Sequence, residues 1–222
     1  MFAWIKNEKV PTGITMLWLI CFLPIQKLFI IYTIMSKIEE LPSRFELLKK
    51  MPKNAVCAEI GVLGGDFASQ IYAVTSPKKL HLIDPWKHET DGAFSLADEN
   101  FPQEDFDAMH RNIPKSLGFR PQVEIHRGYS CDVLKDFDDD YFDWVYLDAC
   151  HWYEEVKKDL LMLLRKVKPQ GWICGHDYQI EPGHQGSGVM RAVNEIINDG
   201  FAKMVYIDSE RWVSYGLKKC HY

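Results

Sequence analysis

The sequence predicts an α/β fold, with a doubly wound and mostly parallel sheet that ends in a C-terminal antiparallel hairpin. From residue 36 onward, short apolar runs of strand character alternate with amphipathic stretches of helical period. This alternation is typical of a parallel sheet with helices on both faces. After the last helical stretch, two further apolar runs follow with only a short connection between them, which indicates a hairpin.

The composition fits one well-buried domain. The chain has 222 residues, of which 47% are hydrophobic and 13% aromatic, and one domain is the expectation at this length. Charges of both signs are interspersed, with a net charge of −5. Binding to nucleic acid without sequence preference needs clustered Lys and Arg. We therefore expect a small-molecule acceptor and no nucleic-acid partner, and a homo-oligomer stays open.

The N-terminal segment stands apart from this domain. We expect an apolar extension over residues 1–35 and a domain over residues 36–222. Residues 13–35 are apolar except around Pro24–Lys27, whereas a membrane span needs about 20 apolar residues and a central Lys costs on the order of 3 kcal/mol. The extension is expected to be an appended leader or an interfacial anchor, so membrane contact is expected only through residues 13–35.

The cysteines indicate a reducing compartment. The chain has 6 of them, scattered and without a C-x-x-C pair, which argues against a disulfide framework or a structural zinc site. We expect a cytoplasmic protein, with association to a membrane through the apolar extension as the alternative.

The first half of the domain is expected to contain three strands. The expected elements are a helix at 38–50, a strand at 55–62, a helix at 64–75, a strand at 79–86, a helix at 106–118 and a strand at 123–130. Residues 86–102 are polar and aromatic without a clear period, and we interpret them as a long excursion or lid.

The second half repeats the alternation and closes the sheet. We expect a strand at 144–147, a helix from about Trp152, a strand at 171–178, a glycine-rich loop at 183–188, a helix at 189–200, and hairpin strands at 202–208 and 212–219. Ligands of open parallel sheets bind at the carboxyl ends of the strands, and the polar residues of interest lie at those ends.

The first strand ends in an acid followed by glycines. Glu59 precedes Gly61, and Gly65 opens the next helix. Glycines allow a sharp turn and a close approach of the backbone to a ligand, while a carboxylate here would repel a diphosphate and could accept from an ammonium group. Asp84 ends the second strand, where an acid can accept from both hydroxyls of a ribose. Each feature alone is also compatible with an ordinary turn.

Together, these residues resemble the cofactor motifs of class I S-adenosylmethionine-dependent methyltransferases. The pattern E-x-G-x-x-x-G at Glu59–Gly65, the acid at Asp84 and the terminal hairpin all match that family. The resemblance implies a Rossmann-like sheet of seven strands, a cofactor whose methionine part contacts Glu59, Gly61 and Gly65, and a ribose held by Asp84. It further implies adenine contacts near Gly128 and Ser130.

A second polar group follows the fourth and fifth strands. Asp148 and His151 come after one, and His176 and Asp177 after the other. If these strands are neighbours, the four side chains converge. Carboxylates and water suit Mg²⁺, a bound divalent ion lowers the pKa of a substrate hydroxyl, and an imidazole titrates near neutral pH as a general base must. Taken singly, Asp148 could instead cap the following helix and His151 could be a turn histidine.

The same segment resembles one methyltransferase family more closely. D-x-x-H-x-Y at Asp148 and the later D-Y at Asp177 are similar to metal-dependent sugar O-methyltransferases and cephalosporin-hydroxylase-like proteins, over roughly Ala55–Asn194. The resemblance makes Asp148 and Asp177 metal ligands and His151 the catalytic base. His176 stands where that family often has a further acid, so Mg²⁺, another divalent cation or no metal at all stay open, with His176 as a tentative ligand.

We therefore expect an O-methyltransferase (EC 2.1.1.-) that uses S-adenosyl-L-methionine and acts on a small hydroxylated acceptor. One alternative is a nicotinamide-dependent oxidoreductase, because Tyr153 and Lys157 match a Y-x-x-x-K spacing, although the glycine pattern does not fit one. Another is a non-catalytic nucleotide-binding module on the same fold.

Overall fold

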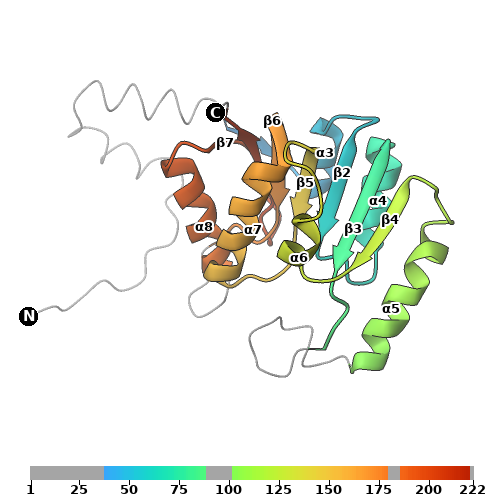
Figure 1. The fold of residues 1–222 in the computed structure, drawn as a ribbon. Coiled ribbons are helices and arrows are strands. Elements are labelled where there is room, and N and C mark those ends of the chain that lie inside the picture. The colour runs from blue at the N-terminus through green and yellow to red at the C-terminus, as the bar shows by residue number, and fades with distance from the viewer. Residues whose placement is uncertain (1–37, 89–101, 180–185, 221–222) are drawn as a thin grey trace, which may run out of the picture. The chain divides into compact units, whose positions relative to one another are not determined.

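The computed structural model of the chain describes residues 38–88, 102–179 and 186–220. The strands of these residues form one sheet (Figure 1). The strands are β1 Glu39–Leu41, β2 Val56–Ile60, β3 Lys79–Asp84, β4 Val123–Arg127, β5 Phe142–Leu147, β6 Val167–Gly175, β7 Ala202–Asp208 and β8 Tyr215–Lys219. The helices are α3 Arg44–Lys50, α4 Asp66–Thr75, α5 Gln103–Ser116, α6 Ser130–Leu134, α7 Tyr153–Lys166 and α8 Gly186–Asn198.

The sheet has the predicted mixed character. Its order is β1-β7-β8-β6-β5-β2-β3-β4. All pairs are parallel except those of β8, which lies between β6 and β7 and runs antiparallel to both. The α/β fold with a C-terminal antiparallel hairpin is thus confirmed, and β5 and β6 are neighbours, so the ends that carry the two polar groups lie side by side.

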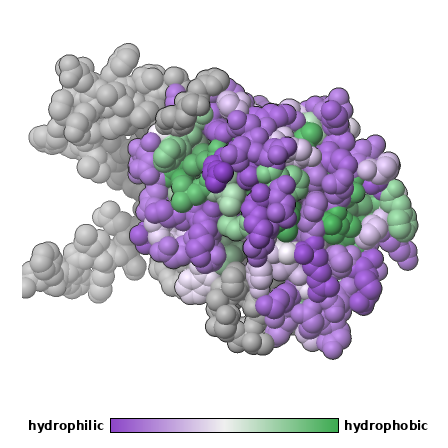
Figure 2. Space-filling model, viewed as in Figure 1, coloured by the Kyte–Doolittle hydropathy of each residue, from purple (hydrophilic) through white to green (hydrophobic). Residues whose placement is uncertain are grey.

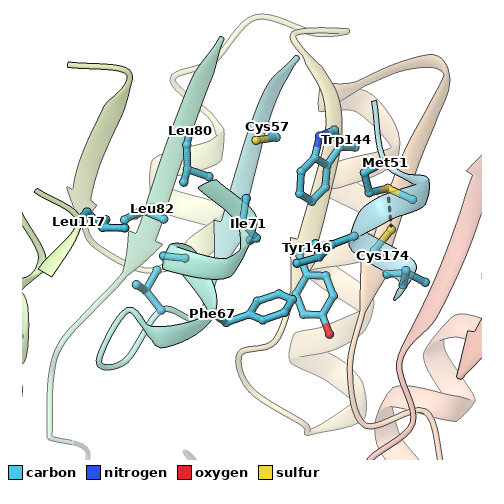
Figure 3. Packing of buried hydrophobic residues seen from close by; sticks show 14 of the residues in the cluster. Met51, Cys57, Phe67, Ile71, Leu80, Leu82, Leu117, Trp144, Tyr146 and Cys174 are labelled. Carbon is cyan, nitrogen blue, oxygen red and sulfur yellow. Dashed lines mark hydrogen bonds between the residues drawn. The ribbon is translucent and has the colours of Figure 1, made fainter. Parts of the chain in front are cut away.

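Helices cover both faces of this sheet (Figure 1). Buried side chains of α3, α4 and α5 pack on one face, and those of α6, α7 and α8 on the other. The first face contains Trp144, Tyr146 and Cys174 of the central strands, against which Phe67 and Ile71 of α4 lie (Figure 3). This packing fixes the helix that follows the glycine loop.

The amphipathic pattern of α7 explains its orientation. Val156, Leu160 and Leu163 are buried against the sheet, and the charged residues between them face outward. Figure 2 shows the face that α6, α7 and α8 form as mostly hydrophilic, with small hydrophobic patches. Two charged residues break the pattern, because Asp159 and Lys166 of α7 are also buried.

Two elements differ from the sequence predictions. The stretch expected as one helix at 38–50 begins as β1, which pairs in parallel with β7, so the sheet has an eighth, short strand. Pro42 and Ser43 separate it from α3, whose first turn is capped by the Ser43 hydroxyl, which accepts from the Glu46 N–H at 3.4 Å. The short helix α6 was also not predicted.

Several expectations lie outside the described residues. These are the apolar extension with its 13–35 run, most of the 86–102 excursion, and residues 183–185 of the glycine-rich loop. Residues 186–188, predicted as part of that loop, instead form the start of α8. Among the described residues, no helix is long and apolar enough to cross a membrane.

Candidate active site

A cavity of about 630 Å³ opens at the carboxyl ends of the central strands. That volume is in the usual range for a small-molecule site. Its walls come from the ends of β2, β3 and β5, the residues that follow β4, and α7. The lining includes Ile60, Gly61, Leu63, Asp84, Lys87, Tyr129, Ser130, Asp148, Ala149, Cys150, His151, Glu155 and Asp159.

Gly61 is required by the close approach of two strand ends. Its φ is +84°, and a Cβ at this position would lie 1.9 Å from the Asp148 carbonyl oxygen. The Asp148 N–H donates to the Ile60 carbonyl at 2.8 Å, which holds the ends of β2 and β5 together. Gly61 therefore sets the distance between the glycine loop and Asp148.

Gly65 makes the turn into α4. Its φ is +85°, and a Cβ there would lie 2.6 Å from Ile113 Cδ1 of α5. Gly64 differs, since a Cβ on it would meet no heavy atom within 4 Å. The loop thus needs glycine at its two ends and tolerates a side chain in between.

Glu59 is a buried acid with an unpartnered oxygen. The residue is 2% exposed, and its Oε2 has no hydrogen-bond partner among the described residues. Burial raises the pKa of the Glu59 carboxyl well above its usual range, the carboxylates of Asp148 and Asp84 add to the rise, and Arg44 opposes it. A cationic ligand group beside Glu59 would supply the missing partner.

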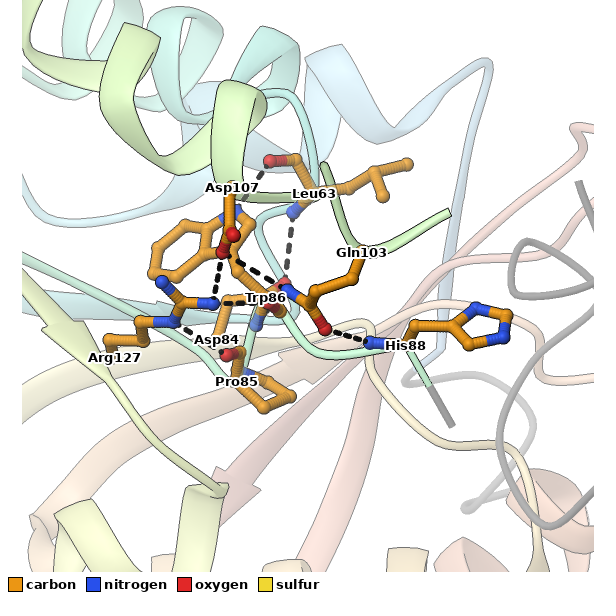
Figure 4. Close-up of polar contacts among 8 residues, drawn as sticks. All are labelled: Leu63, Asp84, Pro85, Trp86, His88, Gln103, Asp107 and Arg127. Carbon is orange, nitrogen blue, oxygen red and sulfur yellow. Dashed lines mark hydrogen bonds and ion pairs between the residues drawn. The ribbon is translucent and has the colours of Figure 1, made fainter. Parts of the chain in front are cut away.

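Asp84 holds the glycine loop in place (Figure 4). Its Oδ2 accepts from the N–H groups of Val62 at 2.8 Å and Leu63 at 3.0 Å, and its Oδ1 accepts from the Trp86 N–H at 2.6 Å. A carboxylate has about four acceptor positions, so these bonds leave capacity for one ligand hydroxyl. The side chain lines the cavity.

Trp86 supports the loop from beneath. Its side chain is fully buried, and its indole N–H donates to the Leu63 carbonyl at 2.8 Å. Arg127 of β4 donates to the Trp86 carbonyl at 2.8 Å and pairs with Asp107 of α5 (Figure 4). Trp86 is therefore a packing residue, and it does not line the cavity in which a methyl acceptor could bind.

The residues after β4 form the opposite wall. Ser130 lines the cavity, whereas Gly128 does not, although the Gly128 N–H donates to the Asp84 carbonyl at 3.0 Å. The Ser130 hydroxyl donates to Asp159. Burial raises the pKa of the Asp159 carboxyl to about 6, against the lowering effect of Ser130 and Cys131.

Asp159 was missed by the sequence reasoning. It could have been found, because an acid stands on the helix face that carries Val156, Leu160 and Leu163. An ionisable residue on an apolar face needs a polar partner or a ligand, and here that face borders the cavity.

Asp148, His151, His176 and Asp177 do converge. His151 Nε2 lies 3.0 Å from Asp177 Oδ2 and 3.9 Å from Asp148 Oδ1. His176 Nδ1 lies 3.3 Å from Asp177 Oδ2 and 3.6 Å from Asp148 Oδ2. Asp148 and His151 line the cavity, while Asp177, 6% exposed, lies behind them.

The acids and histidines of this cluster shift one another's pKa values. Burial alone would lower the pKa of His151, but its interactions with Asp148 and Asp177 outweigh burial and raise the pKa to about 9. Burial is likewise outweighed at Asp177, where His151 and His176 hold the pKa of the carboxyl below its usual range. At neutral pH, His151 is therefore protonated as long as both carboxylates are free.

The backbone at Asp177 is strained. Its φ is +58°, a region that non-glycine residues enter at a cost of about 1–3 kcal/mol and mainly at functional sites. The neighbouring peptides are held, since the Tyr178 N–H donates to the Val213 carbonyl at 2.9 Å. This conformation turns the Asp177 carboxylate toward His151.

The cluster fits a divalent cation. One ligand atom each of Asp148, His151 and Asp177 lie within 4.8 Å of one another. The carboxylates of Asp148 and Asp177 with the imidazole of His176, 3.6 Å and 3.3 Å from them, suit Mn²⁺ or a similar ion at least as well as Mg²⁺. This ligand set leaves His151 beside the ion as a group that can take a proton.

The other candidates from the sequence do not join this site. Tyr153 OH donates to Glu195 of α8 at 2.7 Å, and Lys157 pairs with both. Neither Tyr153 nor Lys157 lines the cavity, which removes the structural basis for a Y-x-x-x-K catalytic pair.

Known structures share this fold. A candidate caffeoyl-CoA O-methyltransferase from Staphylococcus aureus is 14% identical with a TM-score of 0.59, and the match covers 92% of this chain and 96% of that one. A candidate methyltransferase from Streptococcus mutans, in complex with SAH, is 10% identical with a TM-score of 0.56, over 79% of this chain and 95% of the other. A SAM-dependent methyltransferase from Aquifex aeolicus is 14% identical with a TM-score of 0.54, over 78% and 87%.

The sequence itself matches a family. A search of curated proteins found no match, but a family model for a methyltransferase domain matches residues 58–178, which is more than half of the chain. That segment runs from β2 to Tyr178 and includes the glycine loop, Asp84 and the Asp148 cluster. The chain thus belongs to this family of methyltransferase domains, and its fold is that of the class I S-adenosylmethionine-dependent enzymes.

Proposed function

We propose that the chain transfers the methyl group of S-adenosylmethionine to a hydroxyl oxygen of a small acceptor, with help from His151 and a divalent cation. The observation that carries this proposal is the position of Asp148 and His151 in the wall of the same cavity as Gly61 and Asp84. Groups that can bind a cofactor and groups that can deprotonate a hydroxyl thus share one space.

The residues present fit the cofactor. Glu59 does not itself line the cavity but directly precedes Ile60 and Gly61, which do. Its buried, unpartnered oxygen suits the side that would take the ammonium group, with Gly61 and Gly65 shaping the loop around the methionine part. Asp84 retains capacity for a ribose hydroxyl. Ser130, with Asp159 behind it, would face the adenine, and Gly128 would act through its bond to the end of β3. When bound, the cofactor supplies a methyl group on a sulfonium, from which transfer needs mainly alignment with the acceptor oxygen.

In this proposal, His151 and the metal ligands act together to deprotonate the acceptor hydroxyl. Asp148 and Asp177 would hold the cation, with His176 as a further ligand, and the cation would orient the acceptor hydroxyl and make it more acidic. A cation on these carboxylates weakens their hold on the His151 proton and lowers the pKa of the imidazole. His151 would then take the proton that the hydroxyl loses while the hydroxyl oxygen bonds to the methyl carbon, the bond between that carbon and the sulfonium sulfur breaks, and S-adenosylhomocysteine leaves.

The class of acceptor and the cation in this proposal follow from the family resemblance described above. The acceptor is a small hydroxylated molecule such as a sugar, and neither nucleic acid nor a membrane is needed at this site. His176 in place of an acid favours Mn²⁺ over Mg²⁺, because an imidazole is a softer ligand than a carboxylate.

The test is a transfer assay with methyl-labelled S-adenosylmethionine, the full chain and a panel of hydroxylated small molecules, with Mn²⁺, Mg²⁺ or a chelator. We expect metal-dependent labelling of at least one acceptor. Asp177→Asn should abolish the increase in labelling that the metal produces. His151→Gln should lower the rate of labelling by about 10²-fold to 10⁴-fold while S-adenosylhomocysteine still binds.

Asp105→Asn is the matched control, because Asp105 is an exposed acid on α5 that does not line the cavity. Binding of S-adenosylhomocysteine without transfer to any acceptor, in wild type as in His151→Gln, would favour the non-catalytic module. Binding of NAD(H) without binding of S-adenosylhomocysteine would favour the oxidoreductase.

A further inference from the structure

A second cluster of metal-binding side chains lies on β3 and β4, away from the cavity. His81 is paired with Glu124 across the two strands, and His126 is paired with Ile83. Residues two apart on a strand share a face, so Glu124 and His126 lie on the same side of the sheet as His81. None of the three lines the candidate active site.

The three potential ligand atoms have the spacing of a metal coordination sphere. His81 Nδ1 lies 3.0 Å from His126 Nε2 and 3.4 Å from Glu124 Oε2, and His126 Nε2 lies 4.0 Å from the same Glu124 oxygen. In a tetrahedral zinc site with bonds of about 2.0–2.1 Å, ligand atoms are about 3.3 Å apart. Small side-chain rotations would suffice to place all three around one ion.

Outer hydrogen bonds already orient two of the ligands. The other ring nitrogen of His81, Nε2, lies 3.2 Å from the Tyr141 hydroxyl, so a proton on Nε2 leaves the Nδ1 lone pair facing His126 and Glu124. The other oxygen of Glu124 pairs with Lys79. Bonds of this kind are usual behind metal-ligating histidines and carboxylates, where they fix tautomer and direction.

The site is closed on one side and open on the other. The His81 side chain is 2% exposed, that of His126 28% and that of Glu124 46%. An ion can therefore enter from solvent, and a fourth position would remain for water. Two imidazoles and one carboxylate select zinc and neighbouring transition metals over Mg²⁺ or Ca²⁺, which prefer oxygen ligands alone.

We propose that His81, Glu124 and His126 bind one Zn²⁺ or a similar late first-row divalent ion, at a site distinct from the candidate active site. The ion would tie β4, the last strand of the sheet, to β3. Because Ser130 in the cavity wall follows β4 directly, this link would also stabilise the wall. The inference does not rest on the proposed methyl transfer.

The test uses the full chain, freed of metal with a chelator, and titrates it with Zn²⁺ by calorimetry and with Co²⁺ by visible absorption. Asp177→Asn serves as the background, since it removes a ligand of the other cluster and Asn tolerates the left-handed backbone there. In this background we expect one equivalent of Zn²⁺, a tetrahedral Co²⁺ spectrum, and a higher melting temperature with Zn²⁺ present.

Adding Glu124→Gln or His126→Gln should abolish all three signals. Both side chains are partly exposed, so these variants should fold, which circular dichroism would check. Tyr141→Phe removes only the hydroxyl behind His81 and should weaken Zn²⁺ binding by about 10-fold to 100-fold. Absence of Zn²⁺ binding in the Asp177→Asn chain would overturn the proposal. So would unchanged binding in His126→Gln, or a thiolate charge-transfer band showing that Co²⁺ binds to cysteines.

Discussion

At the scale of single residues, His151 and Asp177 determine what the candidate active site can do. Their 3.0 Å contact helps to raise the pKa of His151 and keeps the imidazole protonated in the metal-free protein. In the proposed mechanism, His151 would become a base only after a cation had neutralised its carboxylate partners. Replacement of the His151 imidazolium by a cation, as the partner of these carboxylates, would let an imidazole with a raised pKa act as a base.

The titration of His151 tests this coupling directly. We expect the His151 ring protons to titrate near pH 9 by NMR in the metal-free chain, because two carboxylates stabilise the imidazolium. Asp177→Asn should move the midpoint toward the ordinary value of about 6.5, and saturating Mg²⁺, which is diamagnetic, should do the same in the wild type. A midpoint near 6.5 in the unaltered, metal-free chain would contradict this account.

Glu59 offers a second test at this scale. Glu59→Gln removes a buried carboxyl that has an unpartnered oxygen, so we expect no loss of stability at neutral pH in urea unfolding. S-adenosylhomocysteine should bind about 10-fold to 100-fold more weakly, since a hydrogen bond to a charged group contributes about 1.5–3 kcal/mol. Equal affinities in calorimetry would show that Glu59 does not contact the ligand's ammonium group.

At the scale of elements, the sequence predicted the strand ends well and the remote pairings poorly. Glu59, Asp84 and Asp148 were placed correctly at the carboxyl ends of strands, because apolar runs and the turn residues after them are local signals. The strand β1 was missed, since three residues gain strand character only by pairing with β7, far along the chain.

The side-chain contacts within the site were harder to predict than its location. Asp84 holds the glycine loop by two backbone bonds, from Val62 and Leu63, and Asp159 lies beneath Ser130. Both contacts depend on how loops fold back on the sheet, which no local pattern encodes. The E-x-H alternation of Glu124 and His126 was visible, but only the register with β3 brings His81 beside it.

The glycine loop gives a prediction with an internal control. Gly61→Ala should destabilise the chain by at least about 2 kcal/mol in urea unfolding, because the residue has a positive φ and a Cβ would collide with the Asp148 carbonyl. Gly64→Ala should be neutral within about 0.5 kcal/mol, because a Cβ there meets no neighbour. Similar effects of both substitutions would mean that the ends of β2 and β5 are not in close contact.

At the scale of the whole molecule, the buried His81 and the partly exposed His151 contribute in opposite ways to how stability depends on pH. Burial lowers the pKa of His81 to about 4, so between pH 6.5 and 4 the unfolded chain binds more protons and acid destabilises the fold. The contribution of His151 to stability changes with pH in the opposite direction. Its pKa is raised to about 9, so its contribution is complete below pH 6.5 and is lost as the pH rises through 9.

The free energy of unfolding, measured in urea with a chelator present, should therefore have its maximum near neutral pH. His81→Gln should reduce the slope between pH 6.5 and 4. Asp177→Asn should reduce the alkaline slope and leave the slope between pH 6.5 and 4 unchanged, because the Asp177 carboxyl, whose pKa is lowered, titrates below that range. A chain whose stability rises steadily from pH 6.5 to 9 would contradict the ion pair between His151 and Asp177.

The cavity at the ends of β2, β3 and β5 is the proposed binding site of the methyl-donor cofactor. Calorimetric titration of the full chain with S-adenosylhomocysteine tests it most directly, with Asp84→Ala as the variant that removes the proposed ribose contact. We expect saturable binding of one equivalent in the wild type and loss of that binding in Asp84→Ala, with Asp105→Asn unchanged. Absence of binding in the wild type, with or without Mn²⁺, would contradict the account.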